Sequence, residues 1–405
     1  MNRISEVLSV GRASVPIAGF VAPGYEAVLE AFKHNFLHRR ELGAACSAYV
    51  SGRCVVDLWG GSRTPERNDP WQQGTMALVM STTKGLSALT LAVAHSRGLF
   101  DYDAKVSDYW PEFGQYGKSM VTVAQLLAHQ AGVCVIDTPM TLELLSDPDA
   151  LARVLARQRP AWEPGTRHGY HAVSLGLYQS ELLRRVDPKH RTLGVFFQDE
   201  IAGKLGGGMY IGLPKEVSDR QLAGVRFGRD IGAIFTLPLR LILDAFNPAS
   251  LFSRIARNPK VRRLQEFNTR PYLQIELPSV NGVATARAIA HLYGVFASGG
   301  AELGLNRGTL QRLEQPAVRP SLGAADAVYR IEFAYSHGFL KPFPFFPFSS
   351  STRAYGTPGA GGSQGFADPE TELGFAYVPN SLMLGAIDDK RAVALRHAIS
   401  SCVRR

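Results

Sequence analysis

The apolar positions in the first part of the chain follow two different periods. Residues 25–42 place apolar side chains at helical spacing, which predicts an amphipathic helix. Residues 44–58 instead alternate between apolar and polar types about the dipeptide Ser51-Gly52, which predicts two strands joined by a tight turn. The chain is therefore expected to begin with a helix and a β-hairpin.

A second helix is expected after a charged, proline-containing loop at 63–70. Leu86, Leu89 and Val93 form an apolar stripe, and Gly98 is a residue type that readily ends a helix in the left-handed conformation. From there to about residue 275 the pattern indicates helices and loops.

Strand-like segments return near the end of the chain. Residues 373–378 and 382–387 read as strands, and residues 389–403 as a closing helix. This order predicts an α+β fold, in which an antiparallel sheet flanked by helices is built from both chain ends. The expected domains are a sheet domain made of 1–103 together with 275–405, and an inserted, mainly helical domain at 104–274.

The composition is that of a globular protein with a basic surface. Of 405 residues, 45% are hydrophobic and 20% are charged, which is enough for one large core or two linked ones. The net charge is +9, but the densest basic run, RIARNPKVRR at 254–263, has no interleaved aromatic residue of the kind that stacks on single-stranded bases. We therefore expect no nucleic-acid partner, and a peripheral contact with an anionic membrane fits the charge better.

Three features bear on location. The four cysteines are too few and too unevenly spaced for a disulfide framework. Glu6 and Arg12 interrupt what would be the apolar stretch of a signal peptide. The best hydrophobic stretch, 231–243, contains Pro238 and Arg240 and is too short to span a bilayer. These features favour a cytoplasmic protein, with membrane association left open.

Ser81-Thr82-Thr83-Lys84 is the only Ser-x-x-Lys motif in the chain, and it stands where the second helix begins. A serine hydroxyl becomes a good nucleophile when a neighbouring base takes its proton, and residues i and i+3 of a helical turn face the same side. A helix N-terminus also offers free N–H groups to developing negative charge. Together with burial, this dipole would lower the pKa of Lys84 towards a value at which the amine acts as a base.

The alternative interpretation is a surface helix capped by Ser81. A capping box has Glu or Gln three residues after the cap, whereas this chain has Lys84 there. A cation in the first turn of a helix is unfavourable by about 0.3–1 kcal/mol. The motif therefore favours a chemical role over a capping role.

Several segments in the right order resemble the serine β-lactamase-like and penicillin-binding-protein superfamily, particularly its esterase branch. MSTTKGLSALTLA resembles the nucleophile helix, DYWPEF with VTVAQLLAHQAGV the entry to the helical domain, and WEPGTRHGYHAVSLG the segment of the catalytic tyrosine. LPSVNGVATARAIAHLYGVFASGG and YGTPGAGGSQGFADPETELGFAYVPN resemble the return to the sheet and the strand beside the active site. The likeness covers most of the chain and implies a β-lactamase/transpeptidase-like fold.

The resemblance also implies roles for individual residues. Ser81 would be the acylated nucleophile, with Lys84 and Tyr170 sharing proton transfer, and a phenol beside a lysine ammonium could sit as phenolate. Neither a metal nor a cofactor is implied. The N–H groups of two residues would form the oxyanion hole, Ser81 and Ala360. Thr357, Pro358 and Gly359 would line the substrate site, and His171 would be either pocket-lining or structural.

The chain departs from the penicillin-recognising pattern at two places. Where those enzymes have Tyr-x-Asn this chain has Tyr170-His171-Ala172, and where they have Lys-Thr-Gly it has Thr357-Pro358-Gly359. The missing lysine removes the cation that would hold a β-lactam carboxylate. The resemblance therefore implies a serine carboxylesterase acting on small-molecule esters with short to medium acyl chains. An acyltransferase, a D-amino-acid peptidase or β-lactamase, and a catalytically silent binding protein are the alternatives.

Two further patterns could indicate a catalytic or a binding site. Residues 361–365 match G-x-S-x-G, but the following residues read as strand, turn, strand rather than the helix that a nucleophile elbow needs, so we reject Ser363 as the nucleophile. The apolar stretches 234–246 and 339–348 lie outside any motif. We expect one or both to line an acyl pocket or to touch a membrane. The sequence favours no particular oligomeric state.

Overall fold

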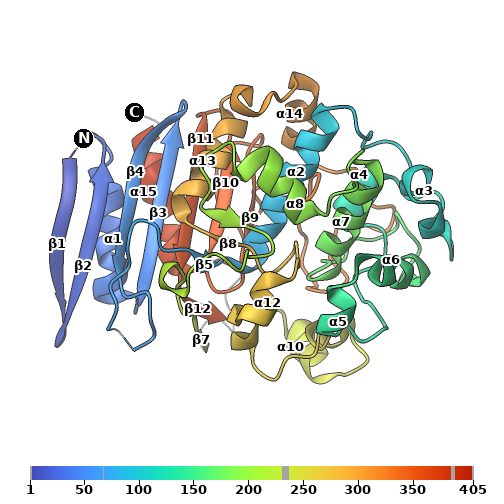
Figure 1. The fold of residues 1–405 in the computed structure, drawn as a ribbon, viewed down its shortest axis with the longest axis horizontal. Helices are drawn as coiled ribbons and strands as arrows, with labels where there is room; N and C mark the ends of the chain where they lie inside the picture. The colour runs from blue at the N-terminus through green and yellow to red at the C-terminus, as the bar shows by residue number, and fades with distance from the viewer. Residues whose placement is uncertain (1, 67, 230–236, 385–387, 404–405) are drawn as a thin grey trace.

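The computed structural model describes residues 2–66, 68–229, 237–384 and 388–403, and a seven-stranded antiparallel sheet stands at one side of it (Figure 1). The strand order is β1-β2-β4-β3-β11-β10-β9, so strands from the start of the chain pair with strands from its end. The strands of this sheet are β1 (Asn2–Val10), β2 (Ala13–Val21), β3 (Gly43–Val50), β4 (Arg53–Gly61), β9 (Tyr355–Pro358), β10 (Gln364–Asp368) and β11 (Leu373–Pro379).

The alternation of side chains along the strands explains why the sheet is covered on both faces. In β11, Phe375 and Tyr377 pack in one hydrophobic cluster with Phe32 and Leu395, whereas Ala376 and Val378 belong to the other. Helices α1 (Glu26–His38) and α15 (Lys390–Val403) pack together on the first face, and α13 (Ala286–Ala297) crosses the second. Period-two alternation thus produces a helix–sheet–helix sandwich.

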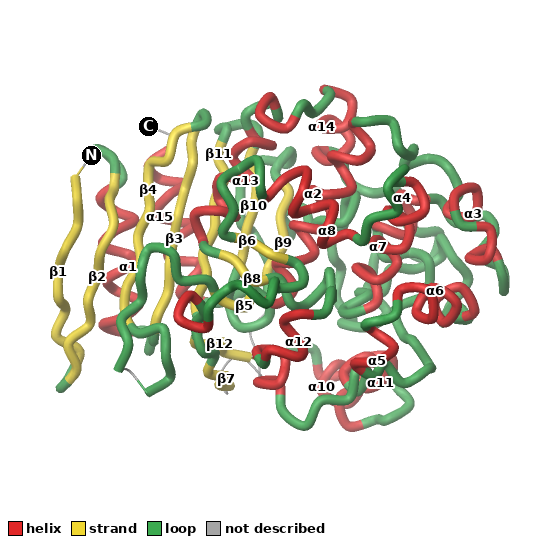
Figure 2. Tube along the Cα trace, viewed as in Figure 1, coloured by secondary structure: helices red, strands yellow, loops and turns green. Residues whose placement is uncertain are grey.

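The remaining helices gather beyond the β9 edge of the sheet (Figure 2). They are α2 (Thr83–Ser96), α3 (Val106–Tyr109), α4 (Val123–Leu127), α5 (Leu142–Leu145), α6 (Pro148–Arg157), α7 (Ser174–Val186), α8 (Leu193–Phe197), α10 (Leu239–Phe246), α11 (Leu251–Ala256), α12 (Arg270–Gln274) and α14 (Arg307–Glu314). Short strands form two small sheets, β5 (Ala77–Leu78) with β8 (Val283–Ala284) and β6 (Met209–Tyr210), and β7 (Arg226–Arg229) with β12 (Ser381–Leu384). A turn of 3-10 helix, η1 (Met80–Thr82), precedes α2.

This is the α+β arrangement that the sequence predicts, with differences at two places. The N-terminal hairpin β1–β2 was not predicted, because β1 pairs with β2 alone at the sheet edge and most of it stays exposed, which leaves a weak alternation. The strand expected at 382–387 is found as β12, but it pairs in parallel with β7 outside the main sheet, and residues 385–387 lie outside the described residues. The division at 103/104 and 274/275 stays a prediction.

The apolar stretch at 339–348 is part of the core. Phe346 and Phe348 are buried, and the ring of Phe348 lies 5.2 Å from that of Phe366 in the sheet. Phe345 is the one phenylalanine of this stretch that stands exposed. Phe343, Phe346 and Phe348 therefore fill the layer beside α15, whereas Leu340 of this stretch borders the cavity described below. The expected membrane contact stays a prediction. No helix among the described residues has the length and apolar character needed to cross a bilayer.

Candidate active site

Ser81 lies in η1, at the point where the chain turns into α2. Met80 takes a left-handed conformation with φ of 47°. Residues other than glycine adopt this backbone conformation at a cost of about 1–3 kcal/mol. A hydrogen bond of 2.9 Å from the Val79 N–H to the Gly282 carbonyl holds the turn. In the run 75–94, Ser81 is the one residue that is not buried. The fold thus fixes the neighbours of Ser81 in the core and leaves its hydroxyl accessible.

Lys84 follows Ser81 by three residues and is buried, with 1% of its surface exposed. Its Nζ donates to the carbonyl oxygens of Ala172 at 2.6 Å and Ser279 at 3.0 Å, and lies 3.3 Å from the Ser81 Oγ. Burial holds the pKa of Lys84 well below its usual value. A neutral amine has two N–H donors and one lone pair, so with two carbonyls accepting, the lone pair is left for the Ser81 hydroxyl.

Tyr170 completes a group of three side chains. Its side chain and that of Ser81 both border the same cavity and interact with each other, and the Nζ of Lys84 lies 4.8 Å from the centre of its ring. Burial raises the pKa of Tyr170. Burial thus favours the neutral forms of both the Lys84 amine and the Tyr170 phenol, whereas the resemblance allowed an ammonium beside a phenolate.

A buried carboxylate holds the segment of Tyr170 in place. Asp326 accepts hydrogen bonds from the N–H groups of Val328 and Tyr329 and from the hydroxyl of Tyr335, each at 2.8 Å, and interacts with the backbone of Tyr170. Burial raises the pKa of Asp326, and these hydrogen bonds oppose that rise. The ring of Tyr170 lies between those of Tyr329 at 5.6 Å and His129 at 5.2 Å. Both the backbone and the ring of Tyr170 are therefore fixed.

The loop after β9 is fastened to the turn that carries Ser81. A Cβ on Gly359 would lie 2.1 Å from the Oγ of Ser363 and 2.4 Å from the carbonyl oxygen of Val79, so only glycine fits. Ser363 donates to that carbonyl at 2.7 Å, and its Oγ lies 3.1 Å from the Thr82 Oγ1. Ser363 is fully buried. It therefore joins two backbone segments and is not placed to attack a substrate.

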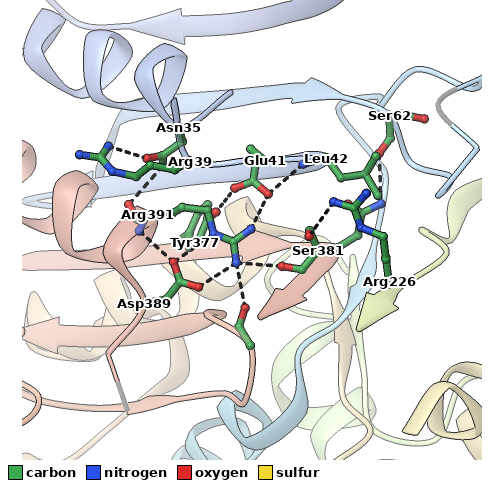
Figure 3. Close-up of polar contacts among 12 residues, drawn as sticks. Asn35, Arg39, Glu41, Leu42, Ser62, Arg226, Tyr377, Ser381, Asp389 and Arg391 are labelled. Carbon is green, nitrogen blue, oxygen red and sulfur yellow. Dashed lines mark hydrogen bonds and ion pairs between the residues drawn. The ribbon is translucent and has the colours of Figure 1, made fainter. Parts of the chain in front are cut away.

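Arg391 also holds this loop, and Figure 3 shows its guanidinium among Glu41, Ser381 and Asp389. This residue, near the start of α15, is 2% exposed, and its guanidinium donates to the carbonyl oxygens of Gly361 at 3.1 Å and Ser381 at 2.8 Å. It also donates to Glu41 at 2.7 Å and to Asp389 at 2.8 Å. The buried Glu41 and the half-buried Asp389 thus orient one guanidinium, and that guanidinium anchors a carbonyl next to Ala360.

A cavity of about 670 Å³ contains the accessible faces of Ser81 and Tyr170. Loop residues 358–361 form part of its wall, so Pro358, Gly359 and Ala360 lie where a substrate would contact them. Most of the remaining wall is apolar, and none of the described residues that line the cavity is charged. This wall comprises Leu237, Leu241, Ile242, Ala245, Phe246, Phe252, Tyr329, Phe333, Leu340 and Leu384. The α10 end of the apolar stretch 234–246 therefore lines the cavity, as expected, while residues 234–236 lie outside the described residues.

Two residues expected at the substrate site lie away from the cavity. His171 is fully buried, its Nδ1 lies 2.6 Å from the carbonyl oxygen of Gly169, and burial lowers its pKa to about 3. Thr357 is buried between Tyr293 and the Thr82 carbonyl, each 3.3 Å from its Oγ1. Neither lines the cavity, so direct contact with substrate is not supported for either, and both belong to the supports of the site.

Other parts of the site were not predicted. The carbonyls of Ala172 and Ser279 that accept from Lys84 are backbone groups, which no pattern of side chains reveals. Asp326 and Arg391 carry no motif of their own. Glu41 stands 350 positions from Arg391 in the sequence, and only the folded sheet brings the two together.

Comparisons with known proteins find relatives along almost the whole chain. A family model described as Beta-lactamase matches residues 26–398. The esterase/beta-lactamase LipL of Mycobacterium tuberculosis is 32% identical over 396 residues, which cover 95% of this chain and 88% of LipL. A crystal structure of a family VIII carboxylesterase matches with a TM-score of 0.84 at 33% identity, covering 95% of this chain and 99% of that one. A penicillin-binding protein homologue from Caulobacter crescentus matches with a TM-score of 0.82 at 32% identity, covering 95% and 99% of the two chains. The expected β-lactamase/transpeptidase-like fold is thereby confirmed.

Proposed function

Because the chain belongs to the beta-lactamase family, we propose that it is a serine carboxylesterase that cleaves neutral esters through an acyl-enzyme on Ser81. One observation carries this proposal: Ser81, Lys84 and Tyr170 meet at a cavity whose described lining is apolar and uncharged. Such a wall suits an acyl chain and offers no cation to a carboxylate substrate. The names of LipL and of the family VIII carboxylesterase point to the same chemistry.

Acylation begins with the proton of Ser81. The lone pair of the neutral Lys84 amine takes this proton while Oγ attacks the ester carbonyl carbon. The carbonyl oxygen becomes an oxyanion, which the N–H groups of Ser81 and Ala360 stabilise. When the ester C–O bond breaks, Tyr170 donates its proton to the leaving alkoxide and recovers one from the Lys84 ammonium. The alcohol leaves, the acyl group stays on Ser81, and Lys84 is neutral again.

Deacylation repeats these steps with water in place of serine. Lys84, with Tyr170 as a relay, takes a proton from the water, and the resulting hydroxide attacks the acyl carbon. The acid leaves when Ser81 Oγ recovers a proton from the same pair. Every proton is thus carried by Lys84 and Tyr170, and the sequence of steps requires no metal or cofactor.

The direct test is a series of p-nitrophenyl esters from acetate to dodecanoate, run beside a chromogenic cephalosporin. We expect the highest kcat/KM with short to medium chains, and a value for the cephalosporin at least about 100-fold lower, because the described lining of the cavity offers no charged partner for its carboxylate. Mass spectrometry after rapid quenching should find the acyl group on the peptide that contains Ser81. Equal kcat/KM for ester and cephalosporin, or no acyl adduct with any ester, would contradict the proposal.

The pH dependence of kcat/KM tests the state of Lys84. The neutral amine is the active form, so the rate should rise with pH through the pKa of Lys84 and reach its plateau well below pH 10.5, since burial lowers that pKa. Lys84→Arg keeps a cation that cannot lose its proton. We expect this variant to lower kcat/KM by at least about 100-fold and to remove the rising limb. The same limb in the residual activity of Lys84→Arg would assign the titration to another group.

A further inference from the structure

Helix α10 exposes large apolar side chains to solvent as well as lining the cavity, and Phe246 does both. Leu239, Leu243 and Phe246 are 71%, 60% and 82% exposed. Their positions, i, i+4 and i+7, place them in one row along the helix. We call this row the apolar stripe. Large apolar side chains gathered on one exposed face mark a contact site more often than single ones do.

Four exposed cations follow in the chain directly after α11, which packs against α10 (Figure 2). None of them forms an ion pair with a described residue, so their charge is available to a partner. They are Arg257, Lys260, Arg262 and Arg263, and we call them the basic quartet.

We propose that the apolar stripe and the basic quartet together dock on an anionic lipid surface. The stripe would enter the boundary between headgroups and acyl chains, while the quartet would meet headgroup phosphates. Leucine and phenylalanine on an exposed helix face beside clustered Lys and Arg are the features with which interfacial helices bind anionic bilayers.

Charge argues against a second copy of the chain as the occupant. In a two-fold symmetric dimer the same surface patch meets itself, so the two basic quartets would face each other. The chain as a whole carries a net charge of +9, which adds to the repulsion. An anionic surface has the complementary sign.

Docking in this way would bring the lipid phase to the wall of the active site. Leu241 and Ile242 on the inner face of α10 line the cavity that contains Ser81. An ester held in the bilayer would then reach the cavity past one helix instead of through bulk water. This consequence rests on the proposed esterase function, whereas the docking itself does not.

Vesicle sedimentation with three multiple variants tests the docking. The stripe variant leaves out Phe246, because Phe246 also lines the cavity. The control changes two similarly exposed apolar residues outside α10 and α11, one of them on the edge strand β1 (Figure 1). The variants are Leu239→Gln with Leu243→Gln; Arg257→Gln, Lys260→Gln, Arg262→Gln and Arg263→Gln; and, as control, Val7→Gln with Met120→Gln.

We expect the unaltered protein to sediment with phosphatidylglycerol vesicles and only weakly with phosphatidylcholine vesicles. Each exposed cation near an anionic surface contributes about a fivefold change in affinity, so the quartet variant should bind at least about 100-fold more weakly. The affinity of the stripe variant for these vesicles should be at least about tenfold lower, and the control should bind like the unaltered protein. Added salt should weaken the binding of the unaltered protein.

Four results would overturn the docking proposal: no binding to phosphatidylglycerol vesicles, equal binding by all variants, equal binding to both lipids, or a dimer in sedimentation velocity that the stripe variant alone disrupts. Hydrolysis of soluble p-nitrophenyl acetate should be the same in every variant, since none of the altered residues lines the cavity. If the esterase proposal were wrong, that ester would not be hydrolysed even by the unaltered protein, whatever the vesicles show.

Discussion

Replacing Ser81 with alanine is expected to lower kcat/KM for a short activated ester by at least about three orders of magnitude, with no acyl adduct detectable on the protein. Losing a nucleophile removes the covalent route altogether and leaves only the contribution of the oxyanion donors and of binding. Ser81 is partly exposed within a buried run, so its hydroxyl contributes little to packing and the variant should keep its stability. Initial rates on p-nitrophenyl acetate and intact-protein mass spectrometry provide the measurement.

Ser363→Ala is the matched control for this variant. Ser363 is also a serine in a glycine-rich segment near the cavity, but its hydroxyl donates to the Val79 carbonyl inside the protein. We expect the alanine variant to lose about 1 kcal/mol of stability with the buried hydrogen bond and still to form the acyl adduct. An adduct that persists in Ser81→Ala and disappears in Ser363→Ala would show that the assignment of the nucleophile is wrong.

The parts of this protein that the sequence predicts are those set by near neighbours in the chain. The helix at α1, the hairpin β3–β4 and the helix start at Ser81 follow from local periodicity and turn residues. The pairing of Ser81 with Lys84 depends on one helical turn, so the motif alone predicts their contact, and the structure places them 3.3 Å apart. The distance of Tyr170 from this pair in the sequence is the reason that only the family resemblance identified it.

The parts of the protein that the sequence did not predict depend on contacts between distant segments. Asp326 and Arg391 are ordinary charged residues until folding buries them beside Tyr170 and the loop after β9. The phenylalanines at 343–348 were expected to form a binding loop, because their spacing between prolines matches neither the helical nor the strand period. Sheet packing decides their role, since Phe348 meets Phe366 across the layer. For the same reason His171 was expected at the substrate, although the neighbouring backbone turns its ring into the core.

Replacing Arg391 with methionine should affect both stability and catalysis. Methionine has a similar length but no charge, so Glu41 would be left buried without its cation, a change that costs about 3–5 kcal/mol in comparable pairs. The Gly361 carbonyl would also lose its donor, and the loop that presents the Ala360 N–H would be held from one side only. Loss of an oxyanion donor lowers kcat by about 100- to 1,000-fold; displacement of one should lower kcat by about tenfold or more, with KM little changed.

Denaturant unfolding and Michaelis kinetics on folded protein separate these two effects. Arg396→Met is the matched control, because Arg396 is an equally buried arginine of α15 that donates to Asp388 and to the side chain of Gln364 instead of to the loop carbonyl. We expect it to lose stability and to keep its kcat. If Arg391→Met lost stability alone, as Arg396→Met should, Arg391 would have no positioning role.

The double variant Glu41→Gln with Arg391→Met makes the distinction sharper. Removing the carboxylate together with its cation leaves no uncompensated charge at Glu41, so a large part of the lost stability should return. The hydrogen bond to the Gly361 carbonyl does not return, because neither glutamine nor methionine at these positions replaces the guanidinium donor. Stability should therefore recover while kcat stays low. If kcat recovered together with stability, the position of the loop would depend on the overall stability of the core and not on the Arg391 hydrogen bond. The contacts of Ser363 would then be sufficient to hold the loop.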